Sequence, residues 1–234
     1  MINVNYKSFI KGKRVAFVGG CPNIKGMDKG ADIDDFDIVI KTNGSVFFDS
    51  EEYYRDYGKR IDVLYTNVQF AREMYPLPVV DFKREGIKWM CMKNCSATDR
   101  AQYSKYLNVR TIEHIIVDVR KVLPSANNGA HIFTDILRCE PAEFYITGLD
   151  FFASKRKAFK HNNYQEYLPG YLPDKIRHQG NKINIGKNED GHNFKDNAFY
   201  VWDLFIRHPN FKTDPFIHEL LHSIIMGEVD QEND

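Results

Sequence analysis

The clearest indication of the fold lies in residues 14–43, which read RVAFVGGCPNIKGMDKGADIDDFDIVIKTN. The stretch begins with the apolar run VAFV, turns at Gly19-Gly20, passes through an acidic turn and ends in the apolar run IVI shortly before Asn43. Two apolar runs joined by turns predict two buried strands. Backbone amides at a glycine turn can bind an anion, and open α/β sheets place ligand contacts where strands end, as at Asn43.

The glycine turn differs from two common nucleotide-binding loops. No third glycine follows Gly19 and Gly20 at the spacing of the GxGxxG dinucleotide fingerprint. No Gly-Lys-Ser/Thr closes the turn, as a Walker loop requires. The sequence therefore excludes both loops and leaves anion binding by the turn open.

A further predicted strand, the third along the chain, also ends in an asparagine. It lies in residues 58–67, GKRIDVLYTN, and its last residue is Asn67. Taken alone, this asparagine could simply end the strand by bonding to the backbone through its side chain. A ligand contact for Asn67 is the other interpretation and depends on the resemblance described below.

A third segment, residues 124–150, reads PSANNGAHIFTDILRCEPAEFYITGLD. It predicts a polar turn, a helix over residues 129–139 and a strand over residues 143–147. Asn127 or Asn128 can cap this helix, and the amides of its first turn then remain for an anion.

The whole chain predicts the α/β class. Strand-like runs are expected at residues 14–18, 37–42, 61–66, 87–92, 113–117 and 143–148. Helical stretches lie between most of them, which indicates a Rossmann-like, mostly parallel sheet flanked by helices.

Length and composition predict one folded domain. A chain of 234 residues with 43% hydrophobic content can bury one substantial core. We expect a single domain over residues 1–227 and a disordered acidic tail over residues 228–234. Residues 155–191 are basic at first and then rich in Asn, Gly, Pro and Tyr, with little periodicity, which predicts a mobile lid over a site.

The segments, taken in order, resemble the sialylmotifs of glycosyltransferase family 29, the eukaryotic-type sialyltransferases. The glycine turn, GADID at residues 30–34 and KTN at residues 41–43 resemble the large motif. Residues 124–150 resemble the small motif, with Asn128 in place of the usual hydroxyl.

Two later segments resemble the remaining motifs of the family. HNNYQ at residues 161–165 is similar to the short third motif. His192 opens a segment similar to the very small motif, His-x4-Glu. Asn197 stands where the glutamate is expected, with Asp196 one position earlier.

The resemblance implies a variant of the glycosyltransferase-A fold that transfers a sugar from a CMP-sugar donor with inversion at the anomeric carbon. Sialic acid is the first expectation for the sugar and Kdo the second; the acceptor is a glycan or glycolipid hydroxyl. The family uses neither metal nor another cofactor. His192 would be the general base, which suits an imidazole with a pKa of about 6.5. His161, Tyr164 or Tyr65 could donate to the departing phosphate. The residues expected to bind the donor are Gly19, Gly20, Asn23, Asn43, Asn67, Asn127, Asn128, Gly129 and Tyr164.

The cysteines depart from the family pattern. Family members link a cysteine of the large motif to one of the small motif, but Val15 stands at the first position and Cys139 at the second. That bridge cannot form, so we expect reduced thiols, as in a cytosol.

Membrane and nucleic-acid signals are weak. No stretch approaches about 20 apolar residues, and the N-terminal residues lack the apolar core of a signal peptide. We therefore expect a cytoplasmic enzyme of microbial or viral type, or a catalytic domain of a longer chain, without an integral membrane segment; peripheral membrane contact stays open. The formal net charge is zero, which argues against a nucleic-acid partner.

Two motifs suggest metal chemistry instead. HELLH at residues 218–222 matches the HExxH of zinc hydrolases, but apolar residues cover one face of its helix and only a short tail follows. The acidic turn from Asp32 to Asp37 contains DxD patterns, which hold a divalent ion on diphosphates. A CMP donor has one phosphate, so we interpret these carboxylates as turn and capping groups.

A binding module is the third class of function. Such a protein would keep the nucleotide pocket without catalysis. The missing glutamate at Asn197 is the reason to keep this alternative.

Overall fold

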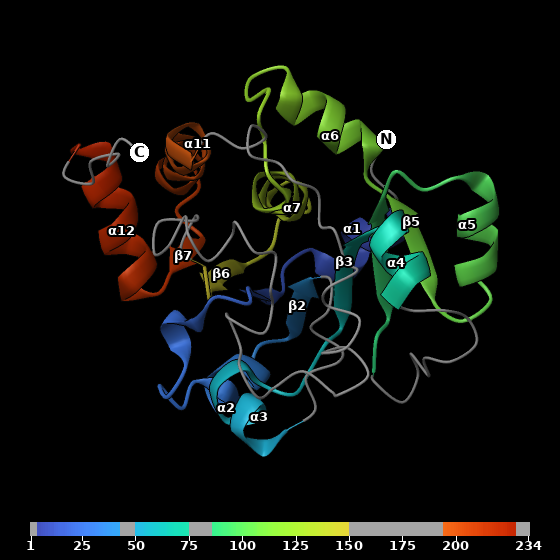
Figure 1. The fold of residues 1–234 in the computed structure, drawn as a ribbon, viewed down its shortest axis with the longest axis horizontal. Helices are drawn as coiled ribbons and strands as arrows, with labels where there is room; N and C mark the ends of the chain where they lie inside the picture. The colour runs from blue at the N-terminus through green and yellow to red at the C-terminus, as the bar shows by residue number, and fades with distance from the viewer. Residues whose placement is uncertain (1–3, 43–49, 75–85, 150–193, 228–234) are drawn as a thin grey trace.

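The computed structural model describes residues 4–42, 50–74, 86–149 and 194–227 (Figure 1). The candidate site residues that lie outside these ranges are Asn43, His161, Tyr164 and His192. The expected lid and the expected acidic tail also lie outside the described residues.

One sheet of seven parallel strands forms the centre of the described structure, in the order β5-β4-β3-β2-β1-β6-β7. The strands are β1 (Arg14–Val18), β2 (Ile38–Thr42), β3 (Val63–Asn67), β4 (Trp89–Lys93), β5 (Asn108–Thr111), β6 (Glu143–Thr147) and β7 (Phe211–Thr213). The chain runs outward from β1 to β5 and then returns to the other side of β1 with β6. The predicted Rossmann-like α/β class is confirmed, and β1 and β6 form the switch point of the sheet.

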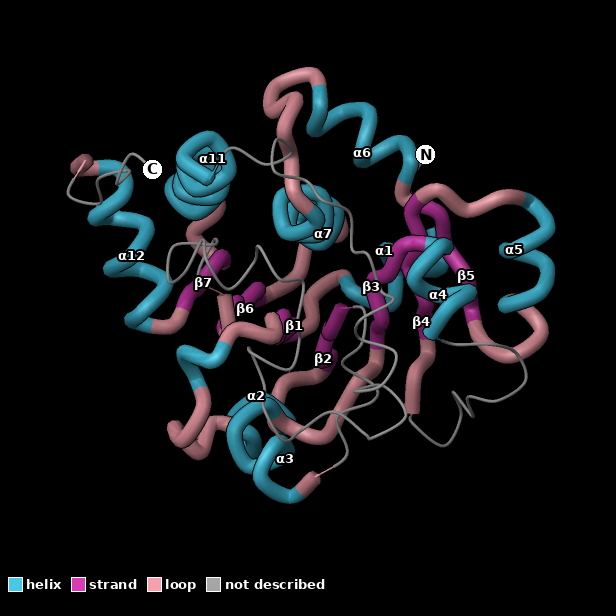
Figure 2. Tube along the Cα trace, viewed as in Figure 1, coloured by secondary structure: helices cyan, strands magenta, loops and turns pink. Residues whose placement is uncertain are grey.

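Helices cover both faces of the sheet (Figures 1 and 2). One face packs against α1 (Val4–Ile10), α6 (Glu113–Arg120), α7 (Asn128–Leu137), α11 (Phe194–Arg207) and α12 (Pro215–Ile225). The other face packs against α2 (Gly30–Asp34), α3 (Glu51–Tyr57), α4 (Val68–Met74) and α5 (Ala97–Tyr103). A short 3₁₀ helix, η1 (Pro22–Ile24), follows β1. None of the helices in the described residues is long and apolar enough to cross a membrane.

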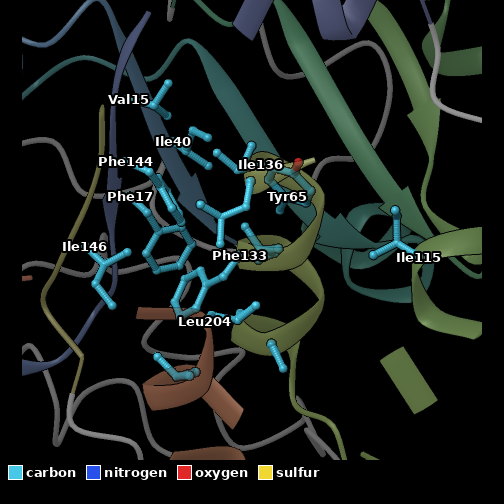
Figure 3. Close-up of a cluster of buried hydrophobic side chains, with 14 of the residues drawn as sticks. Val15, Phe17, Ile40, Tyr65, Ile115, Phe133, Ile136, Phe144, Ile146 and Leu204 are labelled. Atoms are coloured by element: carbon cyan, nitrogen blue, oxygen red, sulfur yellow. The ribbon is translucent and has the colours of Figure 1, made fainter. Parts of the chain in front are cut away.

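The core between β1 and α7 explains the apolar run of the opening sequence. A central parallel strand is covered on both faces, so its residues are apolar without alternation. On the α7 side, Phe133 meets Phe17 edge-on, with ring centroids 5.1 Å apart, and Phe144 at 5.7 Å (Figure 3). Burying an aromatic ring of this size contributes about 1.5–3 kcal/mol, so Phe133 anchors α7 over β1 and β6.

A buried polar network connects α7 to β3 and β5. Asp135 of α7 accepts hydrogen bonds from both Nη atoms of Arg110, the Nη2 bond being 2.7 Å long. It also accepts one from the hydroxyl of Tyr65, 2.7 Å away, and that hydroxyl lies 2.9 Å from the hydroxyl of Tyr6. The Arg110 guanidinium lies 4.5 Å from the centre of the Tyr6 ring. This network links α7 to β3, β5 and α1.

The prediction of a strand at residues 113–117 is wrong, because these residues begin α6. Ile115 and Ile116 are buried whereas Val117 is 57% exposed, which is the one-sided burial of a helix. The strand in this part of the chain is β5, which ends two residues before α6 begins. The sequence did not predict β7. β5 has no apolar run, since its buried residue is the charged Arg110, while β7 has only three residues.

Candidate functional site

The carboxyl ends of the strands meet at one edge of the sheet, and several predicted site residues lie there. Gly19 follows β1, and Asn67 ends β3. Helix α7 precedes β6 and runs antiparallel to it, so its first turn reaches the same edge. Lys93, the last residue of β4, confirms this placement, since its Nζ donates to Oδ1 of Asn128 over 2.6 Å.

Gly19 is required by the backbone at the switch point. Its amide donates to the carbonyl of Thr147 over 2.9 Å, which continues the β1–β6 pairing beyond the strands. A Cβ atom on Gly19 would lie 2.2 Å from the carbonyl oxygen of Gly148, closer than any real contact. Gly148 has a φ of +67°, and its own Cβ would lie 2.7 Å from the Gly19 carbonyl oxygen.

Gly20 has no such neighbour. No atom of the described residues lies within 4 Å of the place where its Cβ atom would be. Packing of the described residues therefore does not explain this glycine, whereas close approach of a ligand to the backbone would.

Asn23, in η1, has an unsatisfied amide. Both Nδ2 and Oδ1 are buried, and neither has a hydrogen-bond partner among the described residues. Burying such a group without partners costs about 1–3 kcal/mol, so nearly all buried polar groups are paired. An amide in this state, four residues after Gly19, is typical of a site that a ligand completes.

Asn67 caps a helix and still has a free donor. Its Oδ1 accepts from the backbone amide of Phe70 over 2.6 Å, which caps the first turn of α4. The interpretation of Asn67 as a residue that bonds to the backbone is therefore confirmed for its oxygen. Its Nδ2 has no partner among the described residues and remains available at the sheet edge.

The first turn of α7 is capped as the sequence predicts. Asn127 is the N-cap residue, with extended backbone angles, and its Oδ1 accepts from the Ala130 amide over 2.9 Å. The amides of Asn128 and Gly129 have no partner among the described residues. Two free amides at the positive end of a helix dipole favour an anion at this point.

Asn197, which replaces the expected glutamate, fixes the start of α11 to the cap of α7. It is 1% exposed, its Oδ1 accepts from the Asn127 amide over 2.9 Å, and its Nδ2 donates to the Ser125 carbonyl over 3.1 Å. An asparagine side chain offers both an acceptor and a donor, whereas an ionised glutamate offers only acceptors. The substitution therefore fits the backbone that surrounds it, and the neighbouring Asp196 is exposed.

The sequence interpretation missed Lys93. Its Nζ lies 2.6 Å from Asn128 Oδ1, and burial, together with the nearby charge of Arg120, lowers its pKa. The sequence feature that could have identified Lys93 is its position at the end of an apolar strand, which it shares with Asn67. The register of the β3–β4 pair sets Asn67 opposite Lys93.

The acidic turn lies at the opposite edge of the sheet. Asp34 accepts hydrogen bonds from the amides of Lys59 and Arg60, both at 2.9 Å, before β3 begins. Asp37 accepts from the amide of Arg14, the first residue of β1, over 2.8 Å. The interpretation of the acidic residues as turn groups is confirmed for Asp34 and Asp37, while Asp32 and Asp35 form ion pairs with Lys29 and Arg14.

The two histidines of the HELLH sequence lie on the exposed side of α12. Their rings lie 5.8 Å (His218) and 6.3 Å (His222) from the ring of Trp202. Across the described ranges, no three His, Cys, Asp or Glu side chains are grouped as metal ligands would be.

All four cysteines are described, and all are free thiols. Burial raises the pKa of Cys91 and of Cys139 to about 12, and that of Cys95 to about 11. These thiols are therefore protonated at neutral pH and are poor nucleophiles and metal ligands.

No protein-family model and no curated protein sequence matches this chain. Its fold is similar to solved structures of sialyltransferases. The monofunctional alpha-2,3-sialyltransferase Cst-I from Campylobacter jejuni is matched with a TM-score of 0.56 at 12% identity, over 91% of this chain and 77% of that one.

Two further structures show the same likeness. The sialyltransferase CstII from Campylobacter jejuni, solved with cytidine-5'-monophosphate, is matched with a TM-score of 0.52 at 13% identity, over 87% of this chain and 80% of that one. A mammalian sialyltransferase is matched with a TM-score of 0.52 at 14% identity, over 86% of this chain and 68% of that one. At these identities the likeness is one of fold, so this chain has a sialyltransferase-like fold.

Proposed function

We propose that this protein is a glycosyltransferase that moves an acidic sugar from a CMP-sugar donor to a hydroxyl of a glycan, with inversion and without a metal ion. The observation that carries the proposal is the set of unsatisfied hydrogen-bonding groups at the carboxyl edge of the sheet. These groups are the side chains of Asn23 and Asn67 and the amides at the start of α7.

The chemistry of these groups suits a cytidine monophosphate. The amide side chains supply donors, and in Asn23 also an acceptor, for the base and ribose. The free amides of Asn128 and Gly129 suit the phosphate, and Gly20 leaves room for a ligand near the backbone. One relative in fold was solved with cytidine-5'-monophosphate, which supports this choice among nucleotides. Sialic acid is the first choice of sugar and Kdo the second.

The proposed reaction needs a base for the acceptor hydroxyl. The hydroxyl oxygen attacks the anomeric carbon, its proton passes to the imidazole of His192, and the bond to the phosphate breaks to release CMP. His161 and Tyr164 would donate hydrogen bonds to that phosphate, and Asn43 would join Asn67 on the nucleotide. Such base assistance is typically worth about 10²–10⁴-fold in rate.

The order of the sequence motifs supports a relationship to family 29. The contacts of Asn197 add to it, because this residue, five positions after His192, is bonded to the cap of α7. The chain that follows the proposed base is thus attached to the proposed phosphate site.

A nucleotide-binding module without catalysis is the second candidate. It was suggested by the asparagine at position 197, but the hydrogen bonds of Asn197 account for that residue without a loss of function. CMP binding with neither hydrolysis of the donor nor transfer would favour the module.

Calorimetry against CMP, UDP, GDP and NAD tests the proposal. We expect CMP to bind most tightly, and Asn67→Ala and Asn23→Ala to weaken CMP binding about tenfold each, since each removes one or more hydrogen bonds. Equal or absent binding of all four nucleotides would contradict the proposal.

The proposed base gives the first prediction about activity. His192→Ala should lower the rate of transfer by about 10²–10⁴-fold and leave the Kd for CMP nearly unchanged, because the base acts on the acceptor. Rates with a CMP-sialic acid donor, together with calorimetry of the variant, measure both quantities. An equal loss of CMP binding would mean that the histidine maintains the structure instead.

A further inference from the structure

Lys93 places a positive charge at the edge of the sheet where the donor is proposed to bind. It ends β4 opposite Asn67, the residue that ends β3. Its Nζ donates to Oδ1 of Asn128 over 2.6 Å. The ammonium therefore lies beside the first turn of α7, where two amides have no partner among the described residues.

No carboxylate of the described residues balances this charge. Lys93 forms no ion pair in the described part of the chain, whereas Lys88, just before the other end of β4, pairs with Asp62 over 2.8 Å. Burial lowers the pKa of Lys93, and the positive charge of Arg120 lowers it further. A largely buried cation that bonds a neutral amide and feels the repulsion of a second positive charge is unfavourable, and an anion would compensate it.

We propose that Lys93 binds an anionic oxygen of the donor, together with the amides of Asn128 and Gly129. This inference rests on the proposed function. It adds a charged binding residue to a donor site that otherwise consists of neutral groups, and it accounts for a lysine at this edge.

Two groups of a CMP-linked acidic sugar could supply the oxygen. One is the phosphate, which CMP also contains; the other is the carboxylate of the sugar, which CMP lacks. Both are oxyanions that accept charge-assisted hydrogen bonds from an ammonium. CMP and a non-transferable CMP-sialic acid analogue therefore distinguish the two sources.

The test compares four proteins by calorimetry with both ligands. The wild type is compared with Lys93→Gln, which keeps a neutral donor for Asn128 but removes the charge, and with Lys93→Arg, which keeps the charge. Lys88→Met removes a lysine charge beside the other end of β4 and serves as the matched control. Thermal unfolding verifies that each variant is folded, and Lys93→Met replaces Lys93→Gln if that variant is not.

We expect Lys93→Gln to weaken binding of the analogue about ten- to a hundredfold, and Lys93→Arg to retain most of it. A similar loss of affinity for CMP would identify the phosphate as the group that Lys93 binds. A loss of affinity confined to the analogue would identify the carboxylate of the sugar. Affinity of the wild type should also fall with added salt more steeply than that of Lys93→Gln. Lys88→Met should bind both ligands like the wild type.

Two results would overturn the inference. Unchanged affinity of Lys93→Gln for both ligands would mean that the charge takes no part in binding. A loss with the same salt dependence as in the wild type would mean that Lys93 only positions Asn128. If the wild type bound neither ligand, the proposed function itself would fail, which is a different outcome from either of these.

Discussion

Gly19 and Gly20 are neighbours in the sequence, but different surroundings constrain them. The position of Gly19 is set by the carbonyl of Gly148, 2.2 Å from where a Cβ atom would be, so the fold requires a glycine there. Among the described residues nothing occupies the place of a Cβ atom on Gly20, so the fold of this part of the chain does not require a glycine there, whereas a bound ligand would. Substitution of each glycine therefore separates a requirement of the fold from a requirement of the site.

We expect Gly19→Ala to lower the free energy of unfolding by about 1–3 kcal/mol, because the backbone must move to relieve the overlap. Gly20→Ala should leave stability unchanged and weaken CMP binding. Urea denaturation and calorimetry on both variants measure these effects. A stable Gly19→Ala, or a Gly20→Ala that binds CMP like the wild type, would contradict this division.

Lys41 is a buried lysine of β2, and no carboxylate of the described residues is in hydrogen-bond contact with it. Its Nζ donates to the carbonyl of Gly58 over 2.6 Å and lies 4.9 Å from the centre of the Tyr53 ring. Burial lowers its pKa from 10.5 to about 7, an effect that the charge of Asp34 partly opposes. The folded protein therefore disfavours the charged form of Lys41.

This lowered pKa predicts how stability depends on pH. Between about pH 7 and 10.5 the unfolded chain binds this proton more than the folded protein does, so the free energy of unfolding rises with pH. From pH 7.0 to 8.5 the gain should be on the order of 1 kcal/mol. Burial lowers the pKa values of His114 and His208, so these histidines titrate below this window in the folded protein. Burial raises the pKa of Cys91 and Cys139 from 9.0 to about 12, so these thiols oppose the gain only above about pH 8, where the unfolded chain begins to lose their protons.

Urea denaturation at pH 7.0 and 8.5 measures the effect, and Lys41→Met is the variant that should lose it. The absolute stability of this variant is not the test, since it also leaves the Gly58 carbonyl without its donor. The same rise in stability for the variant and the wild type would show that another group is responsible.

At the scale of elements, α7 connects the core to the site. Its middle is held by Phe133 against β1 and by Asp135 against Arg110 and Tyr65, while its first turn reaches the sheet edge. A shift of this helix would move the free amides of its first turn. The network around Asp135 therefore affects both stability and the geometry of the proposed phosphate site.

Removal of one member of this network should be costly. Asp135→Leu leaves the Arg110 charge buried without its partner, and we expect a loss of about 3–5 kcal/mol in the free energy of unfolding. The double variant Arg110→Met, Asp135→Leu removes both charges and should be clearly more stable than Asp135→Leu alone. Chemical denaturation of the wild type, both single variants and the double variant measures the coupling. A double variant that loses the sum of the two single effects would contradict this account.

The elements differ in how well the sequence predicts them. β1, β2 and the helix after Asn127 follow from apolar runs and a capping residue, because their local signals agree with their tertiary roles. β5 could not be found, since its buried side chain is charged and becomes compatible with burial only beside Asp135, which lies 25 residues away in the sequence. A strand stabilised by a distant partner carries no local signal.

The same reasoning applies to the candidate site. Asn127 was predicted from cap chemistry, and the structure shows it in that role. Gly19 was predicted as a turn residue, whereas the structure requires a glycine there because the backbone of Gly148 approaches it closely. Lys93 and Asn197 were not predicted, because each acts through a residue that is distant in sequence: Asn128 for the first, Asn127 and Ser125 for the second. Local patterns identify the groups of a site, and the fold decides which of them meet.

At the scale of the whole molecule, the two edges of the sheet hold different groups near the proposed site. The edge where the strands begin holds the acidic turn, in which Asp34 and Asp37 accept hydrogen bonds from backbone amides. The edge where the strands end presents amides, amide side chains and the Lys93 ammonium, while the carboxylates of Glu113 and Asp214 at this edge accept from the backbone amides of Cys95 and Ile217. An anionic donor suits the part of this edge around Lys93 without a metal ion to neutralise it, whereas the DxD carboxylates lie at the other edge.

This separation predicts that transfer does not depend on a divalent cation. Activity with a CMP-sialic acid donor should be the same in excess EDTA as in added Mg²⁺ or Mn²⁺, since amides and one ammonium take the place of a metal on the single phosphate. Asp34→Asn should leave the Kd for CMP unchanged and lower only stability, because Asp34 bonds the amides of Lys59 and Arg60. Transfer assays with and without chelator, and calorimetry of this variant, measure both effects. A transfer rate that falls in EDTA and returns with Mg²⁺ would show that a metal is needed and that the charge arrangement of the described edge is incomplete.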